Sequence, residues 1–166
     1  MNYCLKCANP LHHKIEEGFD RWMCDACGWV FYNNQRPCVT AIPVKDGQVM
    51  LHRRGIEPAK GTWDIPGGFI EVGEKPEDAL HREVAEELGL KIIRYQLLGF
   101  YPDDYGLDDI HTLNIAYVCE FEDAPVQGSN EIDEVKWFTW NALPGAYAFP
   151  SVPTMLADAS KMKIDW

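Results

Sequence analysis

The chain has 166 residues, of which 46% are apolar and 12% aromatic, and its formal net charge is −11 at pH 7. This length and composition predict one domain with a buried core, alone or with a small appendage, and exclude a disordered chain. A net-acidic chain is a poor general binder of nucleic acid or anionic membranes, although cations can still let it hold phosphates. No apolar run approaches 18 residues, and the N-terminal MNYCLKC lacks a signal-peptide pattern, so we expect a cytoplasmic protein without membrane contact.

Two C-x2-C pairs separated by sixteen residues open the chain, formed by Cys4, Cys7, Cys24 and Cys27. This spacing is typical of a structural four-thiolate Zn²⁺ site. Two disulfides in a secreted domain are the alternative, which the lack of a signal sequence disfavours. We therefore predict a zinc ribbon over residues 1–35 and a second domain over residues 36–166. Four basic and four acidic side chains balance within residues 1–36, so nucleic acid is not the expected partner of the ribbon.

A hairpin is predicted next, because two apolar runs flank the turn signal Asp46-Gly47. Pro43 lies inside the first run, which indicates an edge or bulged position. Arg53 and Arg54 end the second run. These arginines are either solvated or available to hold a substrate phosphate or carboxylate.

A loop that feeds a helix follows, GFIEVGEKPEDALHREVAEELGL (residues 68–90). Pro76 suits the first helical position, the apolar residues that follow recur at helical spacing, and Gly89 predicts the end. Glu83, Glu86 and Glu87 stand at i, i+3 and i+4, so their carboxylates converge on one side. A solvated acidic face is one interpretation. The other is a site for Mg²⁺ or Mn²⁺, which prefer such oxygen ligands.

Residues 91–100, 112–121 and 135–138 are predicted strands, and residues 154–162 a final helix. The segment YPDDYGLDDIH between the first two strands, with Asp103, Asp104, Asp108 and Asp109, is either a substrate lid or a solvated loop.

The glutamate-rich segment resembles the Nudix box: Gly68, five residues, Glu74, seven residues, and then REVAEELGL from Arg82. The preceding GTWDIPGG (residues 61–68) is similar to the lead-in of the same family. The resemblance implies a Nudix α/β/α sandwich, with a mixed sheet and helices on both faces, after the N-terminal zinc ribbon.

The resemblance also implies roles for individual residues. It suggests the Gly68 carbonyl, Glu83, Glu86 and Glu87 as ligands of catalytic Mg²⁺ or Mn²⁺, and Glu74 paired with Arg82 as a brace of the loop against the helix. A further catalytic glutamate is expected before a late strand, with Glu131 favoured and Glu134 as its competitor. Substrate-binding candidates also have a core or solvated interpretation; they are Arg53, Arg54, Trp63, Tyr101 and Phe149.

The implied reaction is metal-assisted hydrolysis of a nucleoside diphosphate linked to another group. The short arrangement of ribbon and Nudix domain is similar to ADP-ribose or FAD pyrophosphatases. NADH pyrophosphatases carry the signature S-Q-P-W-P-F-P-x-S after the box, where this chain has RYQLLGFYPDDYG (residues 94–106). Hydrolysis of NADH or NAD-capped RNA and a non-catalytic nucleotide-binding module are the alternatives. A homodimer is also suggested by the resemblance.

Overall fold

We analysed a computed structural model, which describes residues 2–106, 110–164 and 166. Backbone contacts divide the chain into two compact units, residues 1–34 and residues 35–166. Asp108 and Asp109 of the predicted acidic loop lie outside the described residues.

The first unit is a small antiparallel sheet in the order β1-β2-β3, with β1 at His12–Glu16, β2 at Phe19–Met23 and β3 at Val30–Phe31. Its interior is built around Cys4, Leu11 and Cys24, against which Trp22 and Trp29 pack. A core this small cannot stabilise a domain by apolar burial alone, so the unit requires an additional crosslink.

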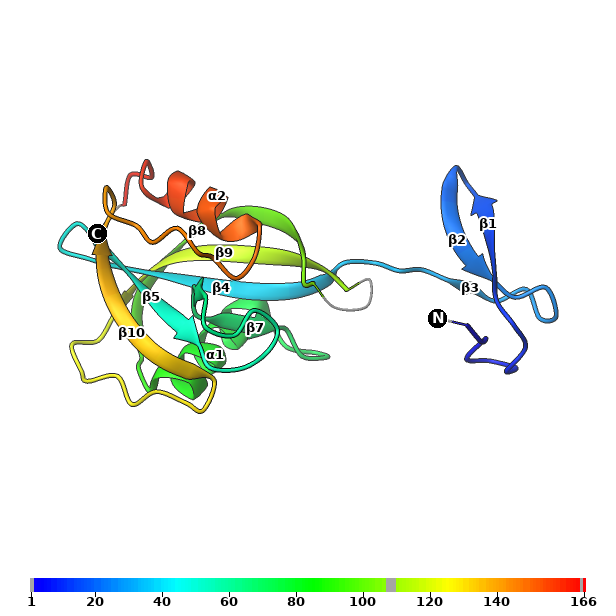
Figure 1. The fold of residues 1–166 in the computed structure, drawn as a ribbon, viewed down its shortest axis with the longest axis horizontal. Helices are drawn as coiled ribbons and strands as arrows, with labels where there is room; N and C mark the ends of the chain where they lie inside the picture. Colours follow the sequence, from blue (N-terminus) through cyan, green and yellow to red (C-terminus); the bar gives the residue numbers. More distant parts are fainter. Residues whose placement is uncertain (1, 107–109, 165) are drawn as a thin grey trace. The chain divides into compact units, whose positions relative to one another are not determined.

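The second unit is a mixed seven-stranded sheet with one helix on each face (Figure 1). Its main path is β10-β5-β4-β9-β8, where β4 spans Arg36–Lys45, β5 Gln48–Arg54, β8 Ile92–Asp104, β9 His111–Phe121 and β10 Ile132–Thr139. The short strands β6 (Trp63–Asp64) and β7 (Gly67–Phe69) pair with β5 and β4. The β4–β9 pair is parallel and the other pairs are antiparallel.

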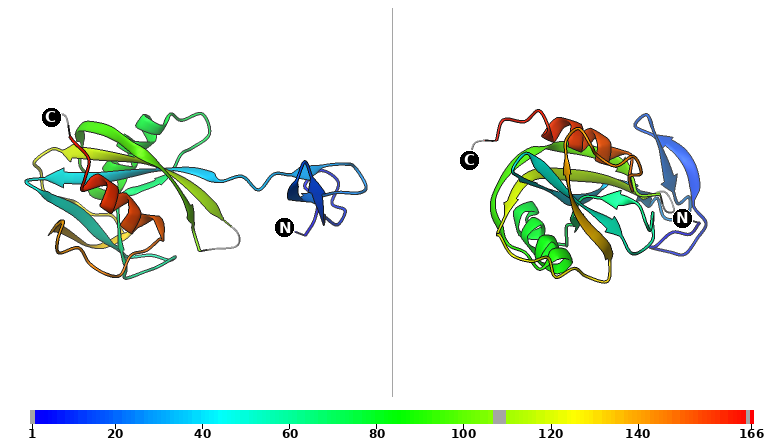
Figure 2. Two further views of the ribbon diagram at one scale, coloured as in Figure 1. Left: turned by 90° about the horizontal axis from the view of Figure 1, so that it is seen from above. Right: turned by 60° about the vertical axis from the view of Figure 1, so that its left-hand side comes forward.

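Each face of the sheet buries its own apolar cluster. Helix α1 (Pro76–Leu88) contributes Ala79, Leu80, Val84 and Leu88 to one cluster, and helix α2 (Ser151–Ala159) contributes Val152, Met155, Leu156 and Ala159 to the other. The further views in Figure 2 agree with two helices on opposite faces. The α/β/α sandwich with a mixed sheet is therefore confirmed.

Helix α1 has the bounds that its sequence indicates. Pro76 stands at its first position, and Gly89 ends it in the left-handed conformation with φ of 66°. Helix α2 begins at Ser151, three residues before the predicted start. The predicted start at residue 154 was wrong, because the helix includes Pro153 in its first turn, where proline is tolerated.

Three strands also differ from the sequence-based prediction. Strand β8 continues to Asp104, so the first residues of the predicted loop pair with β9. Strand β10 begins at Ile132, before the predicted Val135. Pro43 lies in the central strand β4, where it pairs with Cys119 of β9. It stands between the part of β4 that pairs with β7 and the part that pairs with β5. A proline lacks the N–H that continuous pairing on both sides would need.

Candidate active site

The glycine turn between β6 and α1 brings the sheet against the glutamates of α1. The backbone N–H of Gly67 donates a 3.0 Å hydrogen bond to Glu87 Oε2. A Cβ on Gly68 would lie 2.5 Å from the Glu83 carboxyl carbon, and a Cβ on Gly67 would lie 2.1 Å from the Val39 carbonyl oxygen. Only glycine therefore permits this approach of β7 to both β4 and the helix.

Burial changes the protonation of these carboxyl groups. It raises the pKa of Glu87 to about 8, although the hydrogen bond from Gly67 acts in the opposite direction. Burial also raises the pKa of Glu83, against the attraction of Arg82. Because Glu83 and Glu131 also raise the pKa of Glu87 by repulsion, a cation placed among these groups would stabilise their ionised forms.

Arg82 connects the loop before α1 to the helix itself. Its Nε and Nη2 donate to the two carboxylate oxygens of Glu74 at 2.8 and 2.9 Å, and Nη2 also donates to the Phe69 carbonyl at 3.0 Å. Its Nη1 reaches Glu83 at 2.7 Å and Glu86 at 3.2 Å. The bonds from Arg82 lower the pKa of Glu74 to about 2, so this carboxylate stays ionised at ordinary pH.

A pocket of about 260 Å³ lies beside these groups. Of the sequence-predicted site residues, the structure places six in its lining: Arg54, Gly68, Glu83, Glu87, Glu131 and Phe149. Glu86 is outside the lining, with 60% of its side chain exposed. Glu134 is also outside, and its carboxylate lies 3.4 Å from Arg53.

Three of the predicted substrate-binding residues lie elsewhere. Trp63 is buried in the cluster on the α2 side, edge-on to Phe138. The Arg53 guanidinium lies over the Trp63 ring, 5.0 Å from its centroid. The Tyr101 hydroxyl donates to Asp158 at 3.0 Å. None of these three residues is among the described residues that line the pocket.

Arg54 is the one cation among the described lining residues of the pocket. Its Nη1 lies 3.0 Å from Asp64 Oδ2, its Nε donates to the Pro58 carbonyl at 2.8 Å, and its guanidinium covers the Phe149 ring at 5.2 Å. Burial raises the pKa of Asp64 to about 6, against the attraction of Arg54. The arginine is thus held in one place, as a group that orients an anion must be.

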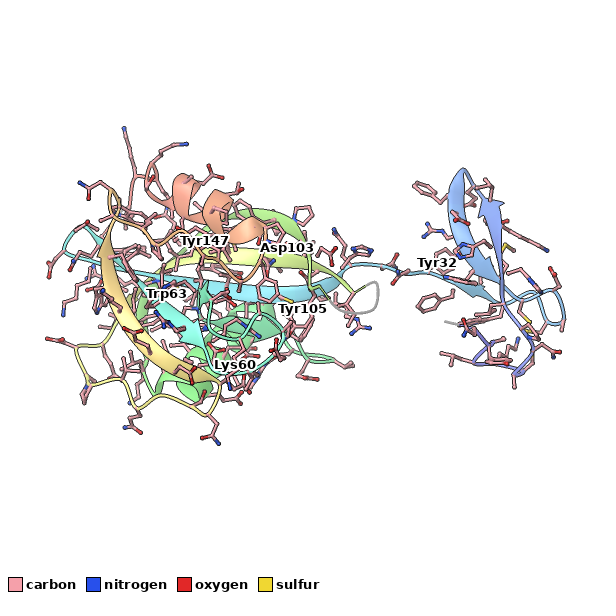
Figure 3. The ribbon with its side chains drawn as sticks, viewed as in Figure 1. Tyr32, Lys60, Trp63, Asp103, Tyr105 and Tyr147 are labelled. Carbon is pink, nitrogen blue, oxygen red and sulfur yellow. The ribbon has the colours of Figure 1, made fainter. Side chains whose placement is uncertain are left out.

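A polar and aromatic part of the pocket lies under the start of α2, and it includes Asp103 and Tyr105 from the segment predicted as a lid or solvated loop. Asp103 Oδ2 accepts a 3.1 Å hydrogen bond from the Ser151 backbone N–H, and Figure 3 shows Asp103 and Tyr105 near this end of the helix. Tyr105 stacks on Phe149 with ring centroids 5.3 Å apart. Thr40 and Asn114 join this part through a 3.4 Å contact between their side chains. Sequence reasoning missed Thr40 and Asn114, because no local pattern marks them and they meet only in the folded chain.

The four ribbon cysteines form a separate cluster. Their sulfur atoms all lie within 4.8 Å of one another, with pairs at 3.4, 3.5 and 3.7 Å. A tetrahedral Zn²⁺ with Zn–S bonds of about 2.3 Å requires sulfur atoms about 3.8 Å apart. The cluster therefore fits a zinc ion.

In the described part of the chain, no helix has the length and apolar character needed to cross a membrane.

Comparisons with known proteins agree with both units. The NUDIX domain model matches residues 34–157, and the Nudix N-terminal model, a zinc ribbon, matches residues 2–33. The chain is 32% identical over 146 residues to the NAD-capped RNA hydrolase NudC of Chromobacterium violaceum, which covers 86% of this chain and 52% of that protein. It is also 32% identical over 113 residues to the ADP-ribose pyrophosphatase of Methanocaldococcus jannaschii, covering 68% of this chain and 67% of that protein.

A solved NUDIX hydrolase from Nitrosomonas europaea is similar over nearly the whole chain. Its TM-score is 0.74 at 26% identity, with 97% of this chain and 91% of that chain covered. The chain spans about half the length of the NudC relatives that it matches. The model match over residues 34–157 shows that the chain belongs to the NUDIX family, with a Nudix-type zinc ribbon before the NUDIX domain.

Proposed function

We propose that this protein hydrolyses the pyrophosphate bond of a nucleoside diphosphate linked to another group, with Mg²⁺ or Mn²⁺ as catalytic cation. The observation that carries the proposal is the buried Glu87 carboxyl, which shares the pocket with Glu83 and Glu131 beside Gly68. Repulsion between a buried carboxylate and its neighbours costs stability unless a cation neutralises it, and hard divalent cations prefer such oxygen ligands.

The oxygen donors of Gly68, Glu83 and Glu87, which line one pocket, are of the kind that such a cation prefers. Glu83, Glu87 and the Gly68 carbonyl would hold it, with Glu86 as an additional ligand at the exposed side. When bound, Mg²⁺ neutralises phosphate charge and makes a bound water more acidic. The hydrogen bonds between Glu74 and Arg82 would hold the loop against α1 and so fix the positions of the ligand side chains.

The other pocket residues would bind and orient the substrate. Glu131 is the favoured general base, since it lines the pocket whereas Glu134 pairs with Arg53 outside it. Arg54, held by Asp64, would orient a substrate anion. The stacked pair of Tyr105 and Phe149 would contact a base or flavin.

ADP-ribose is the substrate that we favour, with FAD as a second candidate. One relative is an ADP-ribose pyrophosphatase, and the pocket of about 260 Å³ is of a size for part of a small nucleotide. NADH or NAD-capped RNA is the alternative that the NudC relatives favour. The acidic chain and the charge-balanced ribbon argue against RNA. A homodimer and a cytoplasmic location stay predictions from the sequence, as do the domain limits 1–35 and 36–166.

A substrate panel tests this proposal. Purified protein with Mg²⁺ is offered ADP-ribose, FAD, NADH and NAD-capped RNA at equal concentration, and nucleoside monophosphate is quantified by chromatography. We expect the highest kcat/KM for ADP-ribose. A highest value for NAD-capped RNA, which falls steeply with added salt, would instead support the RNA alternative. Binding without turnover of any substrate would support a non-catalytic module.

A further inference from the structure

Gly55 directly follows β5 and is buried against the segment that carries Glu131. Its backbone N–H donates a 2.7 Å hydrogen bond to the Glu131 carbonyl. A Cβ at this position would lie 2.9 Å from Asp133 Oδ1, 3.1 Å from the Asn130 carbonyl oxygen and 3.2 Å from the Glu131 carbonyl carbon. The last two contacts are with backbone, so a side chain here would push the segment of Glu131 away.

Arg54, the residue before Gly55, is fixed by the loop that leaves β5. The Arg54 N–H donates to the Thr62 carbonyl at 2.9 Å, and the Gly61 N–H donates to the Arg54 carbonyl at 2.8 Å. Gly55 therefore cannot easily yield to a displaced neighbour. The strain of an added side chain falls on residues 130–133 instead.

A β-bulge gives this segment its direction. The pairing of β10 with β5 shifts register between Ile132 and Glu134, so Asp133 is the extra residue. Ile132 and Val135 both pack on the α1-side cluster although they are an odd number of residues apart. In a regular strand, two residues an odd number of positions apart face opposite sides of the sheet. The bulge at Asp133 therefore lets both side chains face the same side, at the point where the strand leaves the pocket.

From these contacts we propose that Gly55 is a positioning residue that, with the bulge at Asp133, seats Glu131 in the active-site pocket. The proposal rests on the hydrolase function proposed above. The Ser129 hydroxyl supports the same placement, because its oxygen accepts the Glu131 N–H at 3.2 Å. Glu131 would thus join Glu83 and Glu87 of α1 in the pocket from a distant segment of the chain, which Gly55 holds.

A double-mutant cycle tests the proposal. We expect Gly55→Ala to lower kcat about 10- to 100-fold with little change in KM, because a small displacement of a catalytic group has an effect of this size. In the Glu131→Gln background the same substitution should cost less than about twofold, since the group that it displaces has already lost its function. Ser129→Ala removes a more exposed contact, so it should lower kcat less than Gly55→Ala does. This smaller loss of kcat should likewise nearly vanish in the Glu131→Gln background.

Gly145→Ala is the matched control, because a Cβ at this exposed glycine meets nothing within 4 Å and its φ is not positive. It should leave kcat and the melting temperature unchanged. If the losses from Gly55→Ala and Glu131→Gln multiply, or if both Gly55→Ala and Ser129→Ala retain full kcat, the positioning role is overturned while the hydrolase function stands. A wild-type protein that hydrolyses no substrate of the panel refutes the hydrolase function itself.

Discussion

Glu87 Oε2 accepts its hydrogen bond from the Gly67 backbone N–H at 3.0 Å, which joins α1 to the glycine turn of the sheet. The bond supplies only part of what an ionised carboxylate needs, because burial raises the pKa of Glu87 to about 8. A divalent cation is the partner that would complete its surroundings. This relationship makes cation binding and protonation of Glu87 compete.

Cation affinity should therefore depend on pH. Below pH 8 the folded protein holds a proton on Glu87 that a bound cation must displace, so the apparent affinity for Mn²⁺ should fall up to tenfold per pH unit between pH 8 and pH 6. Titration calorimetry at pH 6, 7 and 8 measures this slope. Glu87→Gln should bind more weakly and with a smaller slope. An affinity for wild type that does not change with pH contradicts the assignment of Glu87 as a ligand.

Arg82→Lys tests whether the hydrogen bonds of Arg82, and not its positive charge alone, support catalysis. Lysine keeps the positive charge but cannot make two parallel bonds to Glu74, nor reach Phe69 and Glu83 at the same time. We expect kcat to fall about 10- to 100-fold, as for other groups that orient metal ligands. Steady-state kinetics and thermal unfolding measure the two effects.

Arg94→Lys is the control for that substitution, because Arg94 pairs with Glu120 at 2.7 Å between β8 and β9, away from the active-site pocket. It should leave kcat unchanged. Equal activity of the Arg82 and Arg94 variants would show that the fork geometry of Arg82 has no part in catalysis.

The ribbon should contain one zinc ion per chain and depend on it. Cys24→Ser removes a buried thiolate from the cluster, so zinc content should fall well below one equivalent and the ribbon should become sensitive to protease. Elemental analysis and limited proteolysis measure these changes. Cys38→Ser, at a thiol outside the cluster, should retain the full zinc content. Two disulfides in place of zinc would instead appear as four thiols protected from alkylation until reduction.

Much of the fold and of the site follows from local sequence. Pro76, the apolar spacing and Gly89 predict α1, and helical geometry alone places Glu83 and Glu87 together. The cysteine spacing likewise predicts the cluster, because each pair needs only a short turn to bring two thiols together.

The rest of the pocket depends on how distant segments pack. The sequence favours Glu131 over Glu134 by position alone, and in the fold only Glu131 of the two lines the pocket, with the bulge at Asp133 between them. The contact of Asp103 with Ser151 joins β8 to α2 across 48 residues. A local signal could have pointed to one missed residue, Asp64, since it stands inside the GTWDIPGG segment that leads into the glycine turn.

The most direct test of the hydrolase function is product analysis with wild type and Glu87→Gln in parallel. Wild type with Mg²⁺ should convert ADP-ribose into AMP and ribose 5-phosphate, with no activity after EDTA treatment. Glutamine can keep the hydrogen bond from Gly67 but carries no charge, so the variant should fold and lose about 1,000-fold or more in kcat. A folded Glu87→Gln variant with near-normal kcat would contradict the account.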